Sequence, residues 1–184
     1  MKRSKMSRKR TIDRNAVLDA AEHIVSTLGA TALTIDAVAK ASGITKGGVQ
    51  YCFGNKQDMI AAMVARWGGE FDDEVAAITG PDASGIDKVR AHIKASAQAD
   101  EASSGRASVM MATLLQAPSQ MEENRKWYRE RLAGIDLSSD ANRKLRLAFL
   151  ACEGAFLLRS FNFMAVTDQE WQDIFADIER LLMS

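Results

Sequence analysis

The stretch that decides the fold is residues 34–56, TIDAVAKASGITKGGVQYCFGNK. Thr34 can cap a short helix over residues 35–41, because a threonine hydroxyl accepts a hydrogen bond from the backbone N–H groups of a first helical turn. Gly43 ends that helix, and Thr45 can cap a second short one. Two short helices joined by a tight turn predict a helix-turn-helix, whose second helix enters the major groove of DNA.

The second of these helices carries residues suited to reading DNA. A lysine reaches acceptors on guanine or a phosphate, and a glutamine pairs with adenine through two hydrogen bonds. Glycine costs roughly 1 kcal/mol relative to alanine within a helix, so a glycine pair at its start indicates a close backbone approach to a bulky partner. The outward-facing residues are expected to be Thr45, Lys46, Gly47, Gln50 and Tyr51, and Lys56 with the free N–H groups of the next helix predicts a phosphate site.

A basic segment precedes these helices. Before the first helix the only acidic residue is Asp13, and the cations are Lys2, Arg3, Lys5, Arg8, Lys9, Arg10 and Arg14. Such a segment either follows a phosphate backbone or enters a minor groove, or it is a solvated leader that makes no contact.

The net charge of zero hides an asymmetry. The chain has 184 residues with 24 Lys+Arg and 24 Asp+Glu, but residues 1–60 hold ten cations and five anions, while residues 61–184 hold fourteen and nineteen. We therefore expect a basic DNA-binding domain over residues 1–60 and an acidic ligand-binding and dimerisation domain over residues 61–184.

Helical periodicity runs through the whole chain, and no segment alternates apolar and polar residues as a half-buried strand would. The pattern predicts an all-α fold of about nine helices, with a three-helix N-terminal domain followed by a helical bundle. Capping boxes are expected at Ser84 with Asp87, at Ser119 with Glu122 and at Thr167 with Glu170. Gly105 is expected to separate the fifth helix from a sixth over residues 106–116, and the eighth spans about residues 140–163.

The run from about residue 14 to residue 67 resembles the DNA-binding region of TetR-family (tetracycline-repressor-like) transcriptional regulators. The residues that carry the resemblance are Gly29, Thr34, Ala37, Val38, Ala39, Ala41, Ser42, Gly43, Ile44, Thr45, Gly47, Val49, Tyr51, Phe53, Lys56 and Met59. The resemblance implies DNA-backbone contacts from Thr34, Tyr51 and Lys56. It implies base-edge contacts from Thr45, Lys46, Gly47 and Gln50.

The same resemblance implies a homodimer on a pseudo-palindromic double-stranded operator, formed by the last two helices and released when a small molecule binds in the bundle. The residue pattern also favours association, because the eighth helix is apolar around most of its circumference. The expected interface residues are Ala151, Ala155, Leu158, Trp171, Ile174, Phe175 and Ile178.

Flexible and aromatic side chains in the acidic half suit a cavity that admits a ligand, although ordinary core packing uses the same residues. The expected pocket residues are Met110, Met111, Leu114, Trp127, Phe149, Glu153 and Phe156. Glu153 lies within an apolar stretch, so we expect it to pair with Arg146, Arg159 or a partner subunit, or to attract a cationic ligand.

Several classes of site and protein are not indicated. Cys52 and Cys152 have no metal-ligand spacing, His23 and His92 lie on separate helices, and no nucleophile or phosphate-loop motif is present. We expect no metal, cofactor or catalytic residue, no membrane segment and a cytoplasmic location. The expected function is a sequence-specific DNA-binding regulator, most simply a repressor; the alternatives are a structural DNA-binding factor without an inducer and a helical enzyme.

Overall fold

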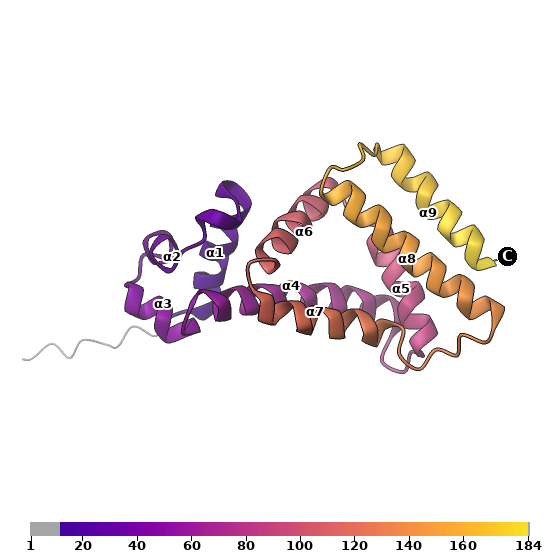
Figure 1. The fold of residues 1–184 in the computed structure, drawn as a ribbon, viewed down its shortest axis with the longest axis horizontal. Coiled ribbons are helices and arrows are strands. Elements are labelled where there is room, and N and C mark those ends of the chain that lie inside the picture. The colour runs from indigo at the N-terminus through magenta and orange to yellow at the C-terminus, as the bar shows by residue number, and fades with distance from the viewer. Residues whose placement is uncertain (1–11, 184) are drawn as a thin grey trace, which may run out of the picture. The chain divides into compact units, whose positions relative to one another are not determined.

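The computed structural model describes residues 12–183 and shows two compact units, one up to Met63 and one from Val64 onward. Within the described residues the chain forms nine α-helices, one short 3₁₀-helix and no strand (Figure 1). The all-α prediction is confirmed. In this part of the chain no helix has the length and apolar character that crossing a membrane requires.

The first unit is built from three helices and the start of a fourth. They are α1 (Arg14–Leu28), α2 (Ile35–Ser42) and α3 (Lys46–Phe53), with the 3₁₀-helix η1 (Ala30–Ala32) between α1 and α2. Each α-helix begins at a side-chain cap, from Asp13, Thr34 and Thr45 respectively. Buried aliphatic and aromatic side chains hold the three together, including Leu18, Val25, Leu33, Val38, Val49 and Phe53.

The tight turn between α2 and α3 has a simple local cause. Gly43 has φ of +68°, in the left-handed region where a side chain is disfavoured, and its N–H bonds back to the carbonyl of Ala39. The α2 helix therefore stops there, and Thr45 starts α3 by accepting a hydrogen bond from the Gly48 N–H at 3.1 Å.

The helix α4 (Lys56–Thr79) belongs to both units, because it starts in the first and continues beyond Met63. Asn55 caps it: its side-chain oxygen accepts from the N–H of Asp58 at 2.9 Å, and its amide donates to the Asp58 carboxylate at 2.8 Å.

The second unit continues with five helices, α5 (Gly85–Ala97), α6 (Glu101–Leu114), α7 (Pro118–Arg131), α8 (Asp140–Ser160) and α9 (Asp168–Met183). Its core lies between α5, α8 and α9, and α8 and α9 run side by side (Figure 1). The core side chains include Val89, Ile93, Leu145, Phe149, Cys152, Trp171, Phe175 and Ile178.

Three local expectations are wrong. Gly105 lies inside α6, which starts at Glu101 because Asp100 accepts a hydrogen bond from the Ser103 N–H. Pro118 occupies the first turn of α7, so no capping box forms one residue later. The α8 helix ends at Ser160 and not at residue 163. The chain turns just after this end, at Asn162, which has φ of 52°. The capping boxes at Ser84 and Thr167 are confirmed.

Candidate DNA-binding surface and ligand cavity

The α3 helix exposes the residues expected to read DNA. Val49 and Phe53 are buried in the first unit, so the opposite face of this short helix is turned to solvent. The side chain of Tyr51 is 87% exposed, although an aromatic ring gains from burial. The other exposed members of the expected set are Thr34, Thr45, Lys46, Gly47 and Gln50, and Lys56 is half-buried.

The two glycines at the start of α3 differ in what surrounds them. A Cβ atom on Gly48 would lie 3.1 Å from the Cδ1 atom of Ile12, so this side chain would have to shift to admit it. A Cβ atom on Gly47 would meet only the hydroxyl oxygen of its neighbour Thr45, at 4.0 Å, and its φ is not in the left-handed region. Nothing within the described residues therefore requires glycine at position 47.

An ion pair orients the first side chain of α3. The Nζ atom of Lys46 lies 3.0 Å from the Oδ2 atom of Asp36, which is in the first turn of α2. Both side chains are largely exposed, so the pair contributes little to stability. Asp36 was not among the expected DNA-binding residues, because its proximity to Lys46 depends on the angle of the turn between the helices.

The two backbone-contact candidates outside α3 lie at helix starts. Thr34 caps α2 by accepting from the Ala37 N–H at 3.0 Å, and Lys56 is the first residue of α4. The N–H groups of a first helical turn favour an anion, as a DNA phosphate would supply. The basic residues Lys2, Arg3, Lys5, Arg8, Lys9 and Arg10 lie outside the described residues.

A partly open cavity of about 310 Å³ lies within the second unit. One stripe of α4 supplies much of its wall, with two aromatic and two acidic side chains at helical spacing. The lining residues are Trp67, Glu70, Phe71 and Glu74 from α4, Ala95, Ser96, Gln98 and Ala99 at the end of α5, Ser103 and Arg106 from α6, and Phe156 from α8.

The structure does not gather the seven expected pocket residues around this cavity. Phe156 lines it, whereas Met110, Leu114 and Phe149 are buried in the packing of the unit. The remaining three, Met111, Trp127 and Glu153, are half-buried. Glu70, Glu74 and Arg106 were not predicted to line a pocket. In the sequence they look like ordinary charged residues on an exposed helix face, and only the packing of the helices brings them to the cavity.

Glu153 is the centre of a polar network inside the second unit. Its Oε1 atom lies 2.6 Å from Nε2 of His92, and its Oε2 atom accepts a hydrogen bond of 2.9 Å from the hydroxyl of Tyr128. The expected partners Arg146 and Arg159 are wrong, and Arg159 pairs instead with Asp168. The true partners lie on α5 and α7, far away in the sequence.

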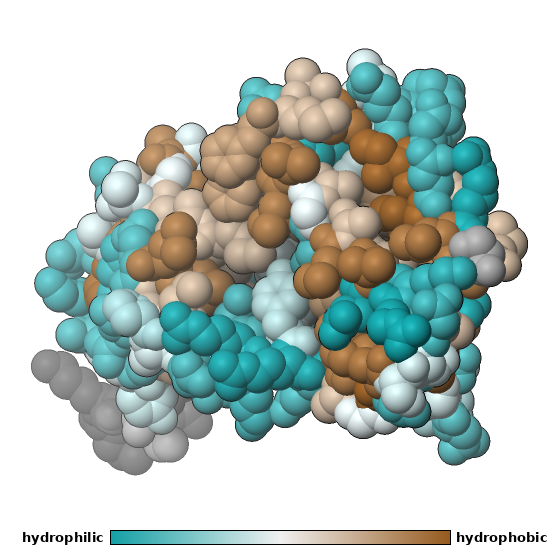
Figure 2. Space-filling view, turned by 45° about the vertical axis from the view of Figure 1, so that its right-hand side comes forward, coloured by the Kyte–Doolittle hydropathy of each residue, from teal (hydrophilic) through white to brown (hydrophobic). Residues whose placement is uncertain are grey.

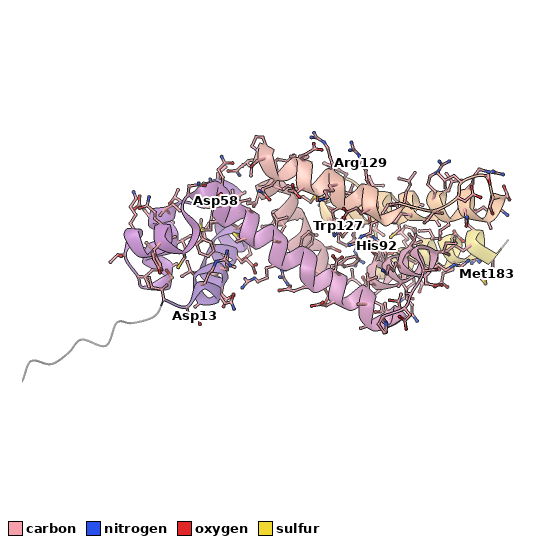
Figure 3. All side chains as sticks on the ribbon, turned by 90° about the horizontal axis from the view of Figure 1, so that it is seen from below. Asp13, Asp58, His92, Trp127, Arg129 and Met183 are labelled. Atoms are coloured by element: carbon pink, nitrogen blue, oxygen red, sulfur yellow. The ribbon has the colours of Figure 1, made fainter. Side chains whose placement is uncertain are left out.

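Aromatic rings enclose the histidine of this network. The ring centroid of Phe71 lies 4.8 Å from that of His92, and those of Phe149 and Trp127 lie at 5.0 and 5.9 Å. Figure 3 shows His92 and Trp127 close together in the bundle. His92 is only 2% exposed, and its Nδ1 atom has no hydrogen-bond partner among the described residues.

Two groups near Glu153, the hydroxyl of Tyr128 and the thiol of Cys152, have raised pKa values. Burial, with a smaller effect of the nearby carboxylate, raises the pKa of Tyr128 far above its usual value. Burial also raises the pKa of the Cys152 thiol to about 12, against an opposing hydrogen bond with Ser96. Ligand atoms of His92, Cys152 and Glu153 lie within 4.8 Å of one another. Two hydrogen-bonded contacts, from Glu153 to His92 and to Tyr128, connect three helices at this point.

A second network ties α7 to α4. The guanidinium group of Arg131 pairs with the carboxylate of Asp72 and lies over the ring of Trp127, 3.9 Å from its centroid. The indole N–H of Trp127 donates to the same carboxylate at 3.4 Å. This part of α4 is thus fixed to α7 by an ion pair and a hydrogen bond, both made by Asp72.

The residues expected at a dimer interface divide into two groups. Trp171, Phe175 and Ile178 are 4–5% exposed and belong to the core of their own chain. Ala151 and Leu158 are exposed on α8, and Ala155 and Ile174 are half-buried.

An exposed apolar stripe follows one face of α8. Leu147, Leu150 and Leu158 are 53%, 55% and 41% exposed, and Ala151 and Gly154 lie between them at helical spacing. Figure 2 shows that hydrophobic side chains gather in patches on one face of the molecule rather than being scattered singly. Patches of this kind mark interaction surfaces in soluble proteins.

Family models match both the N-terminal and the C-terminal part of the chain. Residues 17–63 match the model of the bacterial regulatory proteins of the tetR family, and residues 87–183 match that of the tetracyclin repressor-like C-terminal domain. The curated proteins include no significant sequence match.

Similar solved structures share the fold over nearly the whole chain. A transcriptional regulator from Rhodococcus sp. Rha1 is 19% identical, with a TM-score of 0.69 over 94% of this chain and 97% of that one. NalD, the secondary repressor of the MexAB-OprM multidrug efflux pump in Pseudomonas aeruginosa, is 16% identical, with a TM-score of 0.60 over 91% and 93%. SmeT, in a complex with triclosan, is 19% identical, with a TM-score of 0.61 over 92% and 88%.

The two family models together cover the helix-turn-helix and the bundle, and the second alone covers more than half of the chain. Within the described residues, the capped α2–α3 pair and the all-helical second unit are what such a regulator requires. The chain belongs to the TetR family of DNA-binding transcriptional regulators.

Proposed function

We propose that this chain is a cytoplasmic repressor that binds a pseudo-palindromic operator as a homodimer and releases it when a small molecule enters the bundle. The observation that carries the proposal is the exposed face of α3, where Lys46, Gln50 and Tyr51 are turned to solvent while the opposite face is packed. A surface with a cation, an amide and a phenol on one short helix fits base edges and phosphates together.

Gly47 supports DNA contact independently of the polar residues. Glycine is unfavourable in a helix by roughly 1 kcal/mol relative to alanine, and the fold leaves room for a methyl group at this position. A close approach of DNA to the backbone accounts for a residue that the packing of the chain does not require.

The apolar stripe on α8 supports the homodimer. Leu147, Leu150 and Leu158 lie on one face with the small Ala151 and Gly154 between them, so two copies of α8 can approach closely. A symmetric pair of chains would present two α3 helices to two half-sites, and each half-site alone would bind weakly.

Substitution on this stripe tests the dimer. Leu150→Glu should convert the protein to a monomer in analytical ultracentrifugation and lower operator affinity by more than about tenfold, because one half-site is lost. Leu115→Glu is the matched control, since Leu115 is 67% exposed at the end of α6 and lies outside the stripe. A dimer that survives Leu150→Glu would contradict this interface.

Release by a ligand is supported by the cavity beside α4. Because α4 belongs to both units, a molecule that binds α4 between Trp67 and Glu74 contacts the same helix that begins next to α3. The ligand would change operator affinity only if it binds the DNA-bound and free shapes unequally. NalD, which has this fold, is a repressor, and SmeT, which also has it, was solved with triclosan bound.

The deciding experiment measures operator binding with and without a ligand. An operator would first be selected from random duplexes by the purified full-length chain, and compounds that raise its melting temperature would then be added at saturation. The proposal expects the operator dissociation constant to rise at least about tenfold. An unchanged constant would contradict ligand release and favour a structural DNA-binding factor. Turnover of a bound compound would favour the helical enzyme instead.

A further inference from the structure

We infer that the cavity of the second unit selects small organic cations with an aromatic or apolar body. This inference rests on the proposed function only in taking the cavity as the ligand site, and it adds the chemical class of the ligand. The inference is based on the charged side chains of the cavity wall and on the ion pair that two of them form.

The cavity wall has a negative balance. Among the side chains that the structure describes, its charged residues are Glu70, Glu74 and Arg106, two carboxylates and one guanidinium group. The Nη2 atom of Arg106 lies 2.6 Å from the Oε2 atom of Glu70, so these two charges compensate each other. Glu74 lies one helical turn further along α4 and has no ion-pair partner within residues 12–183.

This pairing disfavours an anionic ligand. An anion would reach the Arg106 guanidinium only by competing with the carboxylate of Glu70, and it would then be close to the uncompensated charge of Glu74. A cation meets the opposite situation, because Glu74 attracts it without the loss of an existing pair.

The rest of the wall suits the body of such a molecule. Trp67 and Phe71 lie on the same stripe of α4 as the two glutamates, and Phe156 from α8 also lines the cavity. Aromatic rings bind cations through the negative face of the π system, and they bind apolar groups by burial. A volume of about 310 Å³ is at the small end of ligand cavities, so the occupant is small.

The neutral polar groups of the cavity wall set a further limit. Ser96, Gln98 and Ser103 line the cavity and offer neutral hydroxyl and amide groups. They can bind water or a hydroxyl of the ligand, but they do not change the charge balance. The selectivity is therefore expected to depend mainly on Glu74.

Two probes with one shared body test the inference on the DNA-free, full-length protein. Benzyltrimethylammonium and benzylphosphonate carry a similar tetrahedral group of opposite charge on the same benzyl ring. Isothermal titration calorimetry should give at least about tenfold tighter binding for the ammonium compound. Equal binding of both probes, or tighter binding of the phosphonate, would overturn the inference.

A pair of adjacent variants locates the charge. Glu74→Gln should weaken binding of benzyltrimethylammonium about fivefold, while Asp73→Asn, at the next position of α4 and outside the cavity wall, should change it less than about twofold. Both side chains are exposed, so unchanged melting temperatures would show that both variants fold. Equal affinities of Glu74→Gln and the unaltered protein would overturn the inference.

The outcome is separate from that of the proposed function. The calorimetry requires no operator, so selective binding of the cation can be observed even if operator affinity does not respond. Conversely, an operator that responds to other compounds while benzyltrimethylammonium fails to bind would overturn only the ligand class.

Discussion

The Nζ atom of Lys46 lies 3.0 Å from the carboxylate of Asp36, so the first side chain of the α3 helix is paired across the turn of the helix-turn-helix. A lysine held by a carboxylate on the DNA-facing side has two effects on binding. Its direction is restricted, and its charge is partly neutralised before DNA arrives. Affinity and selectivity for DNA can therefore be separated at this pair.

The variant Asp36→Asn tests this separation. Removal of the acid should raise affinity for random DNA duplexes, make the dependence on salt concentration steeper by about one ion, and reduce the preference for the operator. Fluorescence anisotropy over a series of salt concentrations measures all three effects. Lys40→Gln, an exposed change of opposite sign on the same α2 helix, should lower affinity for all duplexes without changing the operator preference. If the operator preference survives in Asp36→Asn, the pair does not orient Lys46 for base reading.

The two glycines of α3 should respond differently to alanine. Gly47→Ala leaves the fold intact or stabilises it by up to about 1 kcal/mol, because a methyl group has room and alanine favours a helix. We expect it to lower operator affinity about tenfold by blocking the approach of DNA. Gly48→Ala should lower the free energy of unfolding, because its Cβ atom would lie 3.1 Å from Ile12. Urea unfolding measures the stability of both variants, and operator titration measures their DNA affinity. Normal operator binding by Gly47→Ala would show that DNA does not approach the backbone closely at this position.

The two tyrosines of the chain serve different purposes, and removal of each hydroxyl separates them. Tyr128→Phe should destabilise the protein by about 1–2 kcal/mol, since it removes a buried hydrogen bond to the carboxylate of Glu153. Tyr51→Phe should leave thermal unfolding unchanged and weaken binding to all DNA sequences by a similar factor, because the side chain is 87% exposed. Melting curves measure the stability of both variants, and DNA titrations measure their affinity, so each variant is the control for the other. A stable Tyr128→Phe variant would show that the network contributes little.

Alkaline pH should destabilise the protein through two buried groups. The pKa of the Cys152 thiol rises from 9.0 to about 12, and that of Tyr128 also rises above its usual 10.0, so the folded protein keeps protons that the unfolded chain loses. This contribution to stability is fully present below about pH 9 and is lost as pH rises toward 12. Urea unfolding between pH 8 and about 11 should show the decline. Cys152→Ala should make the decline shallower, and a slope identical to that of the unaltered protein would contradict the assignment.

The same burial predicts which cysteine reacts. Cys152 is buried and its thiol pKa is raised, whereas Cys52 is only half-buried on α3. Iodoacetamide at pH 8 should modify Cys52 in the native protein, and Cys152 only after unfolding. Peptide mass mapping over time distinguishes the two, and equal labelling rates would show that the second unit opens readily.

Much of the fold could be predicted because its signals are local. Thr34, Thr45 and Thr167 each cap a helix as their spacing indicated, and Gly43 ends α2 for a reason that is visible in the residue itself. The wrong helix boundaries arise because local signals can compete with one another. Gly105 is an equally strong local breaker, but Asp100 starts α6 before it, and a helix tolerates an internal glycine at modest cost.

The candidate site could be predicted only where it lies on one element. The exposed residues of α3 follow from its periodicity, because one face of a short helix must be buried. The cavity is different: its wall combines α4, α5, α6 and α8, and residues such as Glu70 and Arg106 become neighbours only through packing. Glu153 shows the same limit, since its partner His92 lies 61 residues away in the sequence.

The position of Trp67 in the cavity wall also makes it an intrinsic fluorescence probe of ligand binding. Of the three tryptophans, Trp171 is buried in the core with its indole N–H bonded to the carbonyl of Ala97, and Trp127 is covered by the guanidinium group of Arg131. Trp67 alone of these lines the cavity. A molecule that enters the cavity is therefore expected to shift or quench the emission of Trp67, so occupancy can be followed in the unlabelled protein at the same time as its binding to DNA.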